Sequence, residues 1–324
     1  MHIYVIMSVN PQKRIIKNNR QTYERMRNPM EKIRILADTS SDLSFEDAKK
    51  LGVELFSIPV FIDEKQYRDG VDFTKDEFYT MLEAAKNIPT TSHIPLSETS
   101  DAYLKAYNDG CEAVIHVCNN SANSGMFNTA NLAKKFFFEE HPEAEGKFRI
   151  EPVDSHTFSL AYALPVIEGI KVRDKGGSVD EILERMDFII NSSEVYLSVH
   201  DLKYAKNSGR VSAASAFVGT MLGIKPIMSM IHGVSASVDK VRGDKAVVPR
   251  LVKAVKDNIN MDEPYFYLVS GYELPETKQL EKALTKELGI KCRGCHKIGA
   301  AVSINIGPKV IAVFIVGKDR RANQ

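Results

Sequence analysis

The segment IRILADTSSDL, residues 33–43, decides which fold the sequence predicts. Residues 33–37 are mostly apolar and predict a buried strand. The short polar side chains that follow, from Asp38 to Asp42, suit a tight turn and the N-cap of a helix. A strand that leads through such a turn into a helix is the starting unit of an α/β fold.

The same alternation continues towards residue 153. The patterns predict strands at 53–62, 113–117 and 148–153, and helices at 45–51, 75–86, 98–108 and 124–138. Parallel strands need long crossover connections, which helices of this length supply. We therefore expect an N-terminal domain with a mostly parallel sheet and helices on both of its faces.

The stretch KGGS at 175–178 marks the expected domain boundary. It separates predicted helices at 157–173 and 179–191, and Gly176 suits the position after a helix end. Beyond it we predict strands at 194–199, 225–231, 265–269 and 310–316, helices at 212–222, 247–259 and 276–288, and a turn at 239–245. The expected organisation is an α/β domain at 32–176 and a smaller mixed α/β domain at 177–324.

Composition excludes several classes of protein. The 324 residues are 44% hydrophobic and 26% charged, which suits a large folded core, and the formal net charge of +1 gives no general attraction to nucleic acid. No apolar run reaches the roughly 18 to 20 residues of a membrane helix. The opening residues lack the basic start and cleavage site of a signal peptide. We expect a cytoplasmic protein.

Residues 1–31 are interpreted as an extension that precedes the folded chain. Residues 1–32 contain seven Lys and Arg residues against Glu24 and Glu31. A basic arm of this kind could contact an anionic membrane surface transiently. The position of Met26 and Met30 shortly before the first strand instead favours an extension that is disordered or foreign to the native protein.

Four cysteines do not form a disulfide framework in a chain of this size. Cys292, Cys295 and His296 match the C-x-x-C-H pattern of haem attachment and the C-x-x-C of redox and zinc sites. We identify no fourth zinc ligand, and the pair precedes a strand rather than opening a helix. We assign no metal, no cofactor and no catalytic residue, and the missing G-x-G-x-x-G and P-loop motifs argue against ATP binding by this chain alone.

Two hydroxyl-rich loops are the candidate binding segments. Residues 90–92 and 121–125 adjoin predicted helix starts, and the second loop follows a predicted parallel strand. Ligands of open α/β sheets bind beyond the strand carboxyl ends, where helix amides attract anions. The alternatives are simple helix capping, or a hydrolase or phosphotransferase with Ser92 or Ser124 as nucleophile, for which no positioned base is recognised.

Six short motifs then appear in a characteristic order: DTSSDL (38–43), PTTS (89–92), NSANSGMFNTA (120–130), VDS (153–155), LKYAKNSGRVS (202–212) and GIKPI (223–227). Together they resemble the DegV family of bacterial fatty-acid-binding proteins, which includes the FakB subunits of fatty acid kinase. The resemblance implies two α/β domains with a long-chain fatty acid in a tunnel between them. FakB-like members present the carboxylate to a separate ATP-dependent kinase, which forms an acyl phosphate.

The resemblance also implies roles for individual residues. Thr91 and Ser92 would bond the carboxylate, with Ser124 and the amide of Gly125 completing the cradle. Arg210 would face the head group. The residues expected along the tail are Met126, Phe127 and Ile224.

Two departures from the family pattern affect the expected site. Asn305 stands in SINIGP (303–308), where the family has a histidine in a T-H-T-G-P-G type of run. An asparagine can donate a hydrogen bond to a carboxylate but cannot carry positive charge, so carboxylate binding is expected to survive better than phosphoryl transfer. His93, Ile94 and Pro95 follow Ser92 in place of the family's Q-P-S, which predicts an altered tunnel mouth and ligand choice.

Overall fold

The computed structural model describes residues 33–210, 223–231 and 233–317. Its first elements follow the prediction from the opening segment. Strand β1 (Ile33–Asp38) leads into the 3-10 turn η2 (Thr39–Ser41), where the Asp38 carboxylate accepts a hydrogen bond from the Ser40 amide at 2.8 Å. Helix α2 (Phe45–Leu51) follows, and Ser44 caps it. The basic extension at 1–31 and the helix expected at 212–222 lie outside the described residues.

The first sheet is fully parallel, in the order β2-β1-β6-β7. Its other strands are β2 (Val53–Phe56), β6 (Ala113–Cys118) and β7 (Arg149–Asp154). Leu36 and Val114 pack on one face beneath α4 (Leu96–Asn108) and α5 (Met126–Glu140), whereas Ile35 and Ile115 face the opposite core. Both faces are therefore covered, and the predicted mostly parallel sheet is confirmed.

The strand expected at 53–62 is two strands in two different sheets. After β2, the chain turns a corner at Ser57 and Ile58 and enters β3 (Pro59–Ile62). This strand pairs with β4 (Lys65–Arg68) and β5 (Thr90–Thr91) in a small antiparallel sheet, and α3 (Lys75–Ala84) lies between β4 and β5 in sequence. The Ile58 amide bonds the Thr39 hydroxyl at 3.1 Å. That long-range contact holds the corner and has no signature in local periodicity.

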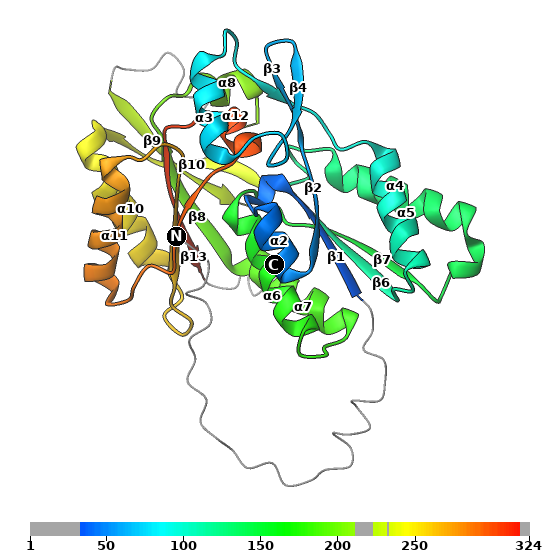
Figure 1. Cartoon of the computed structure of the whole chain (residues 1–324). Coiled ribbons are helices and arrows are strands. Elements are labelled where there is room, and N and C mark those ends of the chain that lie inside the picture. The colour runs from blue at the N-terminus through cyan, green and yellow to red at the C-terminus, as the bar shows by residue number, and fades with distance from the viewer. Residues whose placement is uncertain (1–32, 211–222, 232, 318–324) are drawn as a thin grey trace.

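The second main sheet is mixed and has six strands in the order β10-β9-β8-β13-β11-β12. Their bounds are β8 (Ser193–Val199), β9 (Ile224–Ile231), β10 (Val234–Arg242), β11 (Phe266–Ser270), β12 (Cys295–Lys297) and β13 (Val310–Val316). Helices α10 (Val247–Asn258) and α11 (Pro275–Leu288) cover its outer face (Figure 1). Four of these six strands were predicted. The other two are β10, which was partly expected as a turn and forms an exposed edge strand, and the short edge strand β12.

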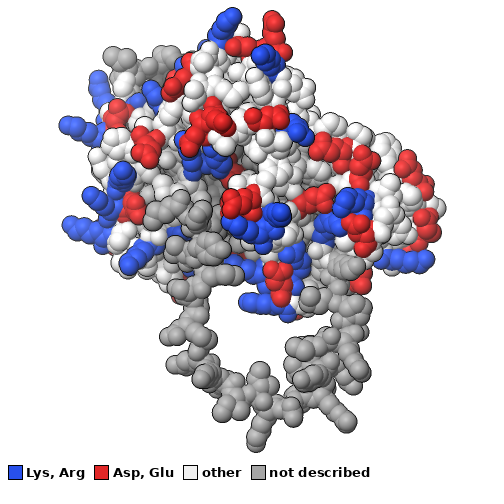
Figure 2. Space-filling model, in the orientation of Figure 1, with Lys and Arg blue, Asp and Glu red and all other residues white. Residues whose placement is uncertain are grey.

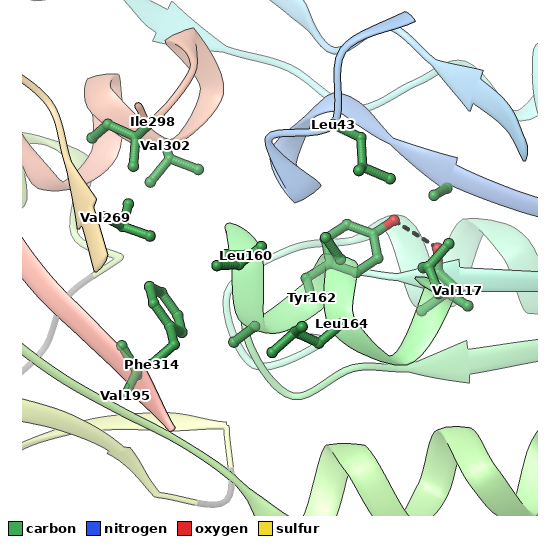
Figure 3. Packing of buried hydrophobic residues seen from close by; sticks show 14 of the residues in the cluster. Leu43, Val117, Leu160, Tyr162, Leu164, Val195, Val269, Ile298, Val302 and Phe314 are labelled. Carbon is green, nitrogen blue, oxygen red and sulfur yellow. Dashed lines mark hydrogen bonds between the residues drawn. The ribbon is translucent and has the colours of Figure 1, made fainter. Parts of the chain in front are cut away.

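One core joins the two main sheets. Helices α6 (Leu160–Arg173) and α7 (Val179–Ser192) pack against each other and lie between the sheets (Figure 1). Figure 3 shows Val117 and Tyr162 on one side of this core and Val195 and Phe314 on the other. The α/β class is confirmed, whereas the boundary at 176 and 177 stays a prediction, because the helices on both sides of it belong to the shared core.

Short elements complete the described chain: η3 (Pro142–Ala144), α8 (Lys203–Ser208), η4 (Asp244–Ala246) and α12 (Ala300–Ile306). Acidic and basic side chains are interspersed over the face in Figure 2, as the near-zero net charge predicts. Among the described residues, no helix is both long enough and apolar enough to cross a membrane.

Candidate ligand-binding site

A cavity opens where the carboxyl ends of β1 and β6 meet α12. It encloses about 840 Å³, including its mouth to solvent. One part of its wall is polar and the other apolar. The lining residues are Ser40, Ile58, Thr91, Ser92, His93, Asn119, Asn120, Asn123, Ser124, Met126, Phe158, Arg210, Ala301, Val302, Asn305 and Ile306.

The topology explains why these side chains converge. Ser40 follows β1 and Asn119 follows β6, and these adjacent parallel strands end at the same edge of the sheet. Thr91 arrives on β5, Arg210 follows α8, and Asn305 lies on α12. The second half of the chain thus closes a crevice of the kind that open α/β sheets present to ligands.

Most of the residues predicted for the site line this one cavity. They are Thr91, Ser92, Ser124, Met126, Arg210 and Asn305. Gly125 lies at its edge, where a Cβ atom would stand 2.9 Å from the His93 ring. Phe127 packs against the core under α4 and α5, and Ile224 begins β9 opposite Arg242, so neither lines the cavity. Contacts of Phe127 and Ile224 with a ligand tail stay predictions.

The polar wall contains one Lys or Arg side chain among the described lining residues, Arg210. Its guanidinium donates to the Asn123 carbonyl oxygen, which directs the side chain across the loop that carries Ser124. Asn305 uses its Nδ2 to bond the Ala301 carbonyl at 2.7 Å and keeps its second amide hydrogen for another acceptor. A guanidinium, several hydroxyls and amide donors suit an anionic head group.

The two serines considered as nucleophiles have no visible base. The Ser124 hydroxyl accepts from the Met126 amide at 3.3 Å, and the Ser92 hydroxyl reaches only the His93 carbonyl at 3.5 Å. Within the described part of the chain, neither hydroxyl bonds an imidazole or a carboxylate. Binding is therefore better supported by this geometry than nucleophilic catalysis at Ser92 or Ser124.

A buried network beneath the cavity was not predicted. The Ser40 hydroxyl donates to the Asp38 carboxylate and accepts from Asn119 Nδ2 at 3.0 Å. The Asp38 carboxylate also accepts from the Tyr162 hydroxyl at 3.3 Å, and burial raises the pKa of Asp38 to about 6. Ser40 could have been found from its place after β1. Ile58, Phe158 and the α12 residues Val302 and Ile306 come from three separate segments and carry no local signal.

The cysteine pair lies away from this cavity. Cys292 is partly buried against the core of the six-stranded sheet, and Cys295 lies on its edge strand β12. Burial raises the pKa of Cys292 to about 11 and also raises the pKa of Cys295. A reactive or redox-active thiol has a depressed pKa instead. The raised pKa values argue against a redox role for the pair, and Cys292 packs as a structural side chain, whereas Cys295 is exposed.

Fold and cavity together define a class of α/β protein in which two main sheets share a core and a partly apolar cavity opens at the carboxyl ends of the parallel strands. The chain belongs to the DegV family, whose model, described as uncharacterised proteins of that family, matches residues 32–318. A DegV domain-containing protein of Clostridium perfringens is 28% identical over 283 residues, which cover 87% of this chain and 97% of that protein. A counterpart from Caldanaerobacter subterraneus is 29% identical, with coverage of 89% and 100%.

Solved structures show the same fold. A stearic-acid-binding protein from Eubacterium ventriosum is 25% identical, with a TM-score of 0.78 over 89% of this chain and 99% of that chain. A fatty acid binding DegV family protein from Streptococcus agalactiae is 27% identical, with the same TM-score and the same coverage. The family and fold class inferred from the six motifs are confirmed.

Proposed function

We propose that this protein is a cytosolic carrier that binds one long-chain fatty acid in the cavity. The carboxylate lies against Thr91, Ser92, Ser124 and Arg210, and the tail enters the apolar part of the wall. The observation that carries the proposal is the convergence of these polar residues, from separate segments, on one partly apolar cavity. Fatty-acid binding by the two solved relatives supports it.

A fatty-acid carrier needs a cavity with both an apolar and a polar surface, because the tail and the carboxylate have opposite solvation requirements. Burying a chain of about 16 carbons at roughly 0.8 kcal/mol per methylene stabilises the complex by about 12 kcal/mol relative to water. A carboxylate, in contrast, loses hydration when it is buried and needs charged or polar partners. The cavity provides both surfaces, with Met126 and Phe158 on the apolar side and Arg210 on the polar side.

We also propose that the bound acid is presented to a separate ATP-dependent kinase. Two features support this: the absence of recognised nucleotide-binding motifs in the sequence, and exposed Ser92 and Arg210 at the mouth of the cavity. Asn305 supplies a neutral amide where the family pattern has histidine. A kinase of matching specificity must therefore supply the positive charge that the histidine of the family pattern would carry.

Native mass spectrometry of the purified protein tests the binding proposal. We expect the mass of the chain plus one fatty acid, and denaturing extraction should release that acid in about one equivalent. Incubation of the loaded protein with ATP and its cognate kinase should convert the acid to an acyl phosphate. A folded protein that is empty and stays empty with added oleic acid would contradict the proposal.

Replacing Arg210 with alanine should weaken the binding of oleic acid about ten-fold, because one exposed charge-assisted hydrogen bond contributes roughly 1.5 kcal/mol. Oleyl alcohol has the same tail without the charge, so its affinity should be unchanged. Lys206→Ala is the matched control, since Lys206 is exposed on α8 and does not line the cavity. Equal losses for the acid and the alcohol would show that Arg210 acts on the cavity shape instead.

A further inference from the structure

Helix α12 is the wall that the second half of the chain places over the cavity. It contributes Ala301, Val302, Asn305 and Ile306 to the lining. The chain reaches it from β12, at the edge of the six-stranded sheet, and α12 packs against η2, β5 and α3 of the first half. Any displacement of this helix would open the apolar side of the cavity.

Two carboxylates of the first half, those of the half-buried Asp42 and the buried Asp69, hold the amino end of α12. Asp42 Oδ1 accepts from the Gly299 amide at 2.6 Å, and Asp69 Oδ2 accepts from the Ala301 amide at 3.3 Å. The helix has no side-chain cap of its own at Gly299. The first amides of a helix lack partners within the helix, so these acids act as caps supplied from a distant part of the chain.

Neighbouring contacts join the same two parts of the molecule. Lys75 Nζ bonds the Asp42 carbonyl at 2.9 Å and the Lys297 carbonyl at 2.8 Å. The Tyr79 hydroxyl lies 2.8 Å from the Ser303 hydroxyl. We call Asp42, Asp69, Lys75 and Tyr79, with the segment 297–303 that they hold, the α12 clamp.

A glycine flanks α12 at each end. Gly299 precedes the helix, and a Cβ atom there would stand 3.1 Å from Asp42 Oδ1, so glycine permits the close approach of the carboxylate. Gly307 ends the helix with a φ of 95°, a conformation that side chains other than glycine rarely adopt. The helix between these glycines has only seven residues. Its position therefore depends on the clamp more than on its own stability.

We propose that Asp42 and Asp69 are positioning residues for the ligand cavity, and that release of the α12 clamp is the step through which a bound fatty acid exchanges. The inference rests on the proposed function. It identifies carboxylates that do not line the cavity but set the lifetime of the complex. A ligand with a buried tail leaves only when an enclosing wall moves, and α12 is a wall whose attachment crosses between the two halves.

The test measures release of cis-parinaric acid, a fluorescent C18 fatty acid, from the full chain after mixing with excess oleic acid. Asp69→Ala should release it about ten times faster than the wild type. Asp69→Asn keeps an oxygen acceptor for the Ala301 amide and should stay within about three-fold of the wild type. Ser178→Ala, which removes the capping box of α7 away from the cavity, should lower stability without changing the release rate.

Release from Asp69→Ala at the wild-type rate would overturn the inference, provided that the wild type binds the probe. Absence of any binding by the wild type would overturn the proposed function as well. If Asp69→Ala does not fold, amide hydrogen exchange of the wild type tests the inference instead. Loading with oleic acid should slow exchange at 297–306 at least ten-fold and leave 179–192 unchanged, and equal effects on both segments would overturn the inference.

Discussion

Replacing Asp38 with asparagine should make the protein more stable above pH 6 and reduce the pH dependence of stability that the wild type shows between about pH 4 and pH 6, leaving the part that Asp42 and Asp69 contribute. Asp38 is fully buried, and burial raises the pKa of its carboxyl group from 3.8 to about 6. In this window the folded state binds more protons than the unfolded state, so stability falls as the pH rises. The difference between variant and wild type should grow by about 3 kcal/mol from pH 4 to pH 8.

Asparagine is the suitable replacement because it retains the shape and an acceptor oxygen for the Ser40 amide and hydroxyl. Urea unfolding at several pH values measures the effect. Asp101→Asn is the control for the loss of one carboxylate, since Asp101 is exposed on α4 and lies outside the buried Asp38 network. Parallel profiles of stability against pH for the wild type and Asp38→Asn would show that burial does not shift the pKa of this carboxyl group.

The polar half of the site could be predicted from the sequence because it consists of loops that follow strands and precede helices. Ser124 lies in such a loop, and the rule for strand carboxyl ends places it at the edge of the parallel sheet. Thr91 was predicted from its hydroxyl-rich segment, although it lies on β5 of the small antiparallel sheet. The same rule applied to the opening segment would have added Ser40. Asn119 follows β6 directly, so the same rule would also have predicted it as a site residue.

The apolar half could not be predicted in this way. Val302 and Ile306 belong to a helix of seven residues that no periodic pattern marked, and Phe158 stands before α6. Their role depends on how the second half of the chain folds back over the first. The clamp residues Asp42 and Asp69 are equally hidden, because their partners are backbone amides more than 200 positions away in sequence.

The fold was predictable where apolar runs were buried and their flanking turns had clear chemistry. Strands β1, β6 and β13 appeared as expected. Strand β10 was only partly recognised because it is an edge strand whose exposed polar residues resemble a turn. The corner between β2 and β3 was missed because both segments have strand propensity and the break depends on a tertiary contact.

Replacing Tyr162 with phenylalanine should destabilise the protein by about 3 kcal/mol, because it removes one hydroxyl that serves two buried backbone groups. The hydroxyl accepts from the Asp38 amide at 2.9 Å. It donates to the Val117 carbonyl at 2.7 Å, the bond drawn in Figure 3. These groups lie at the carboxyl ends of β1 and β6, directly beneath the cavity. The variant leaves both without that partner in a site that water does not reach.

The loss of stability in Tyr162→Phe should depend on pH. The direction of this dependence distinguishes the loss of the hydrogen-bond network from a change in packing. The single Tyr162 hydroxyl proton is shared between the Val117 carbonyl at 2.7 Å and the Asp38 carboxylate at 3.3 Å, and the second contact lowers the pKa of Asp38, although burial dominates. Its removal therefore costs most when Asp38 is charged, so the destabilisation should be larger at pH 8 than at pH 5. Tyr107→Phe provides the control, since the described structure shows ring contacts but no hydrogen bond for the Tyr107 hydroxyl. A pH-independent loss for Tyr162→Phe would uncouple this hydroxyl from the Asp38 carboxylate and leave only its backbone contacts to explain its effect.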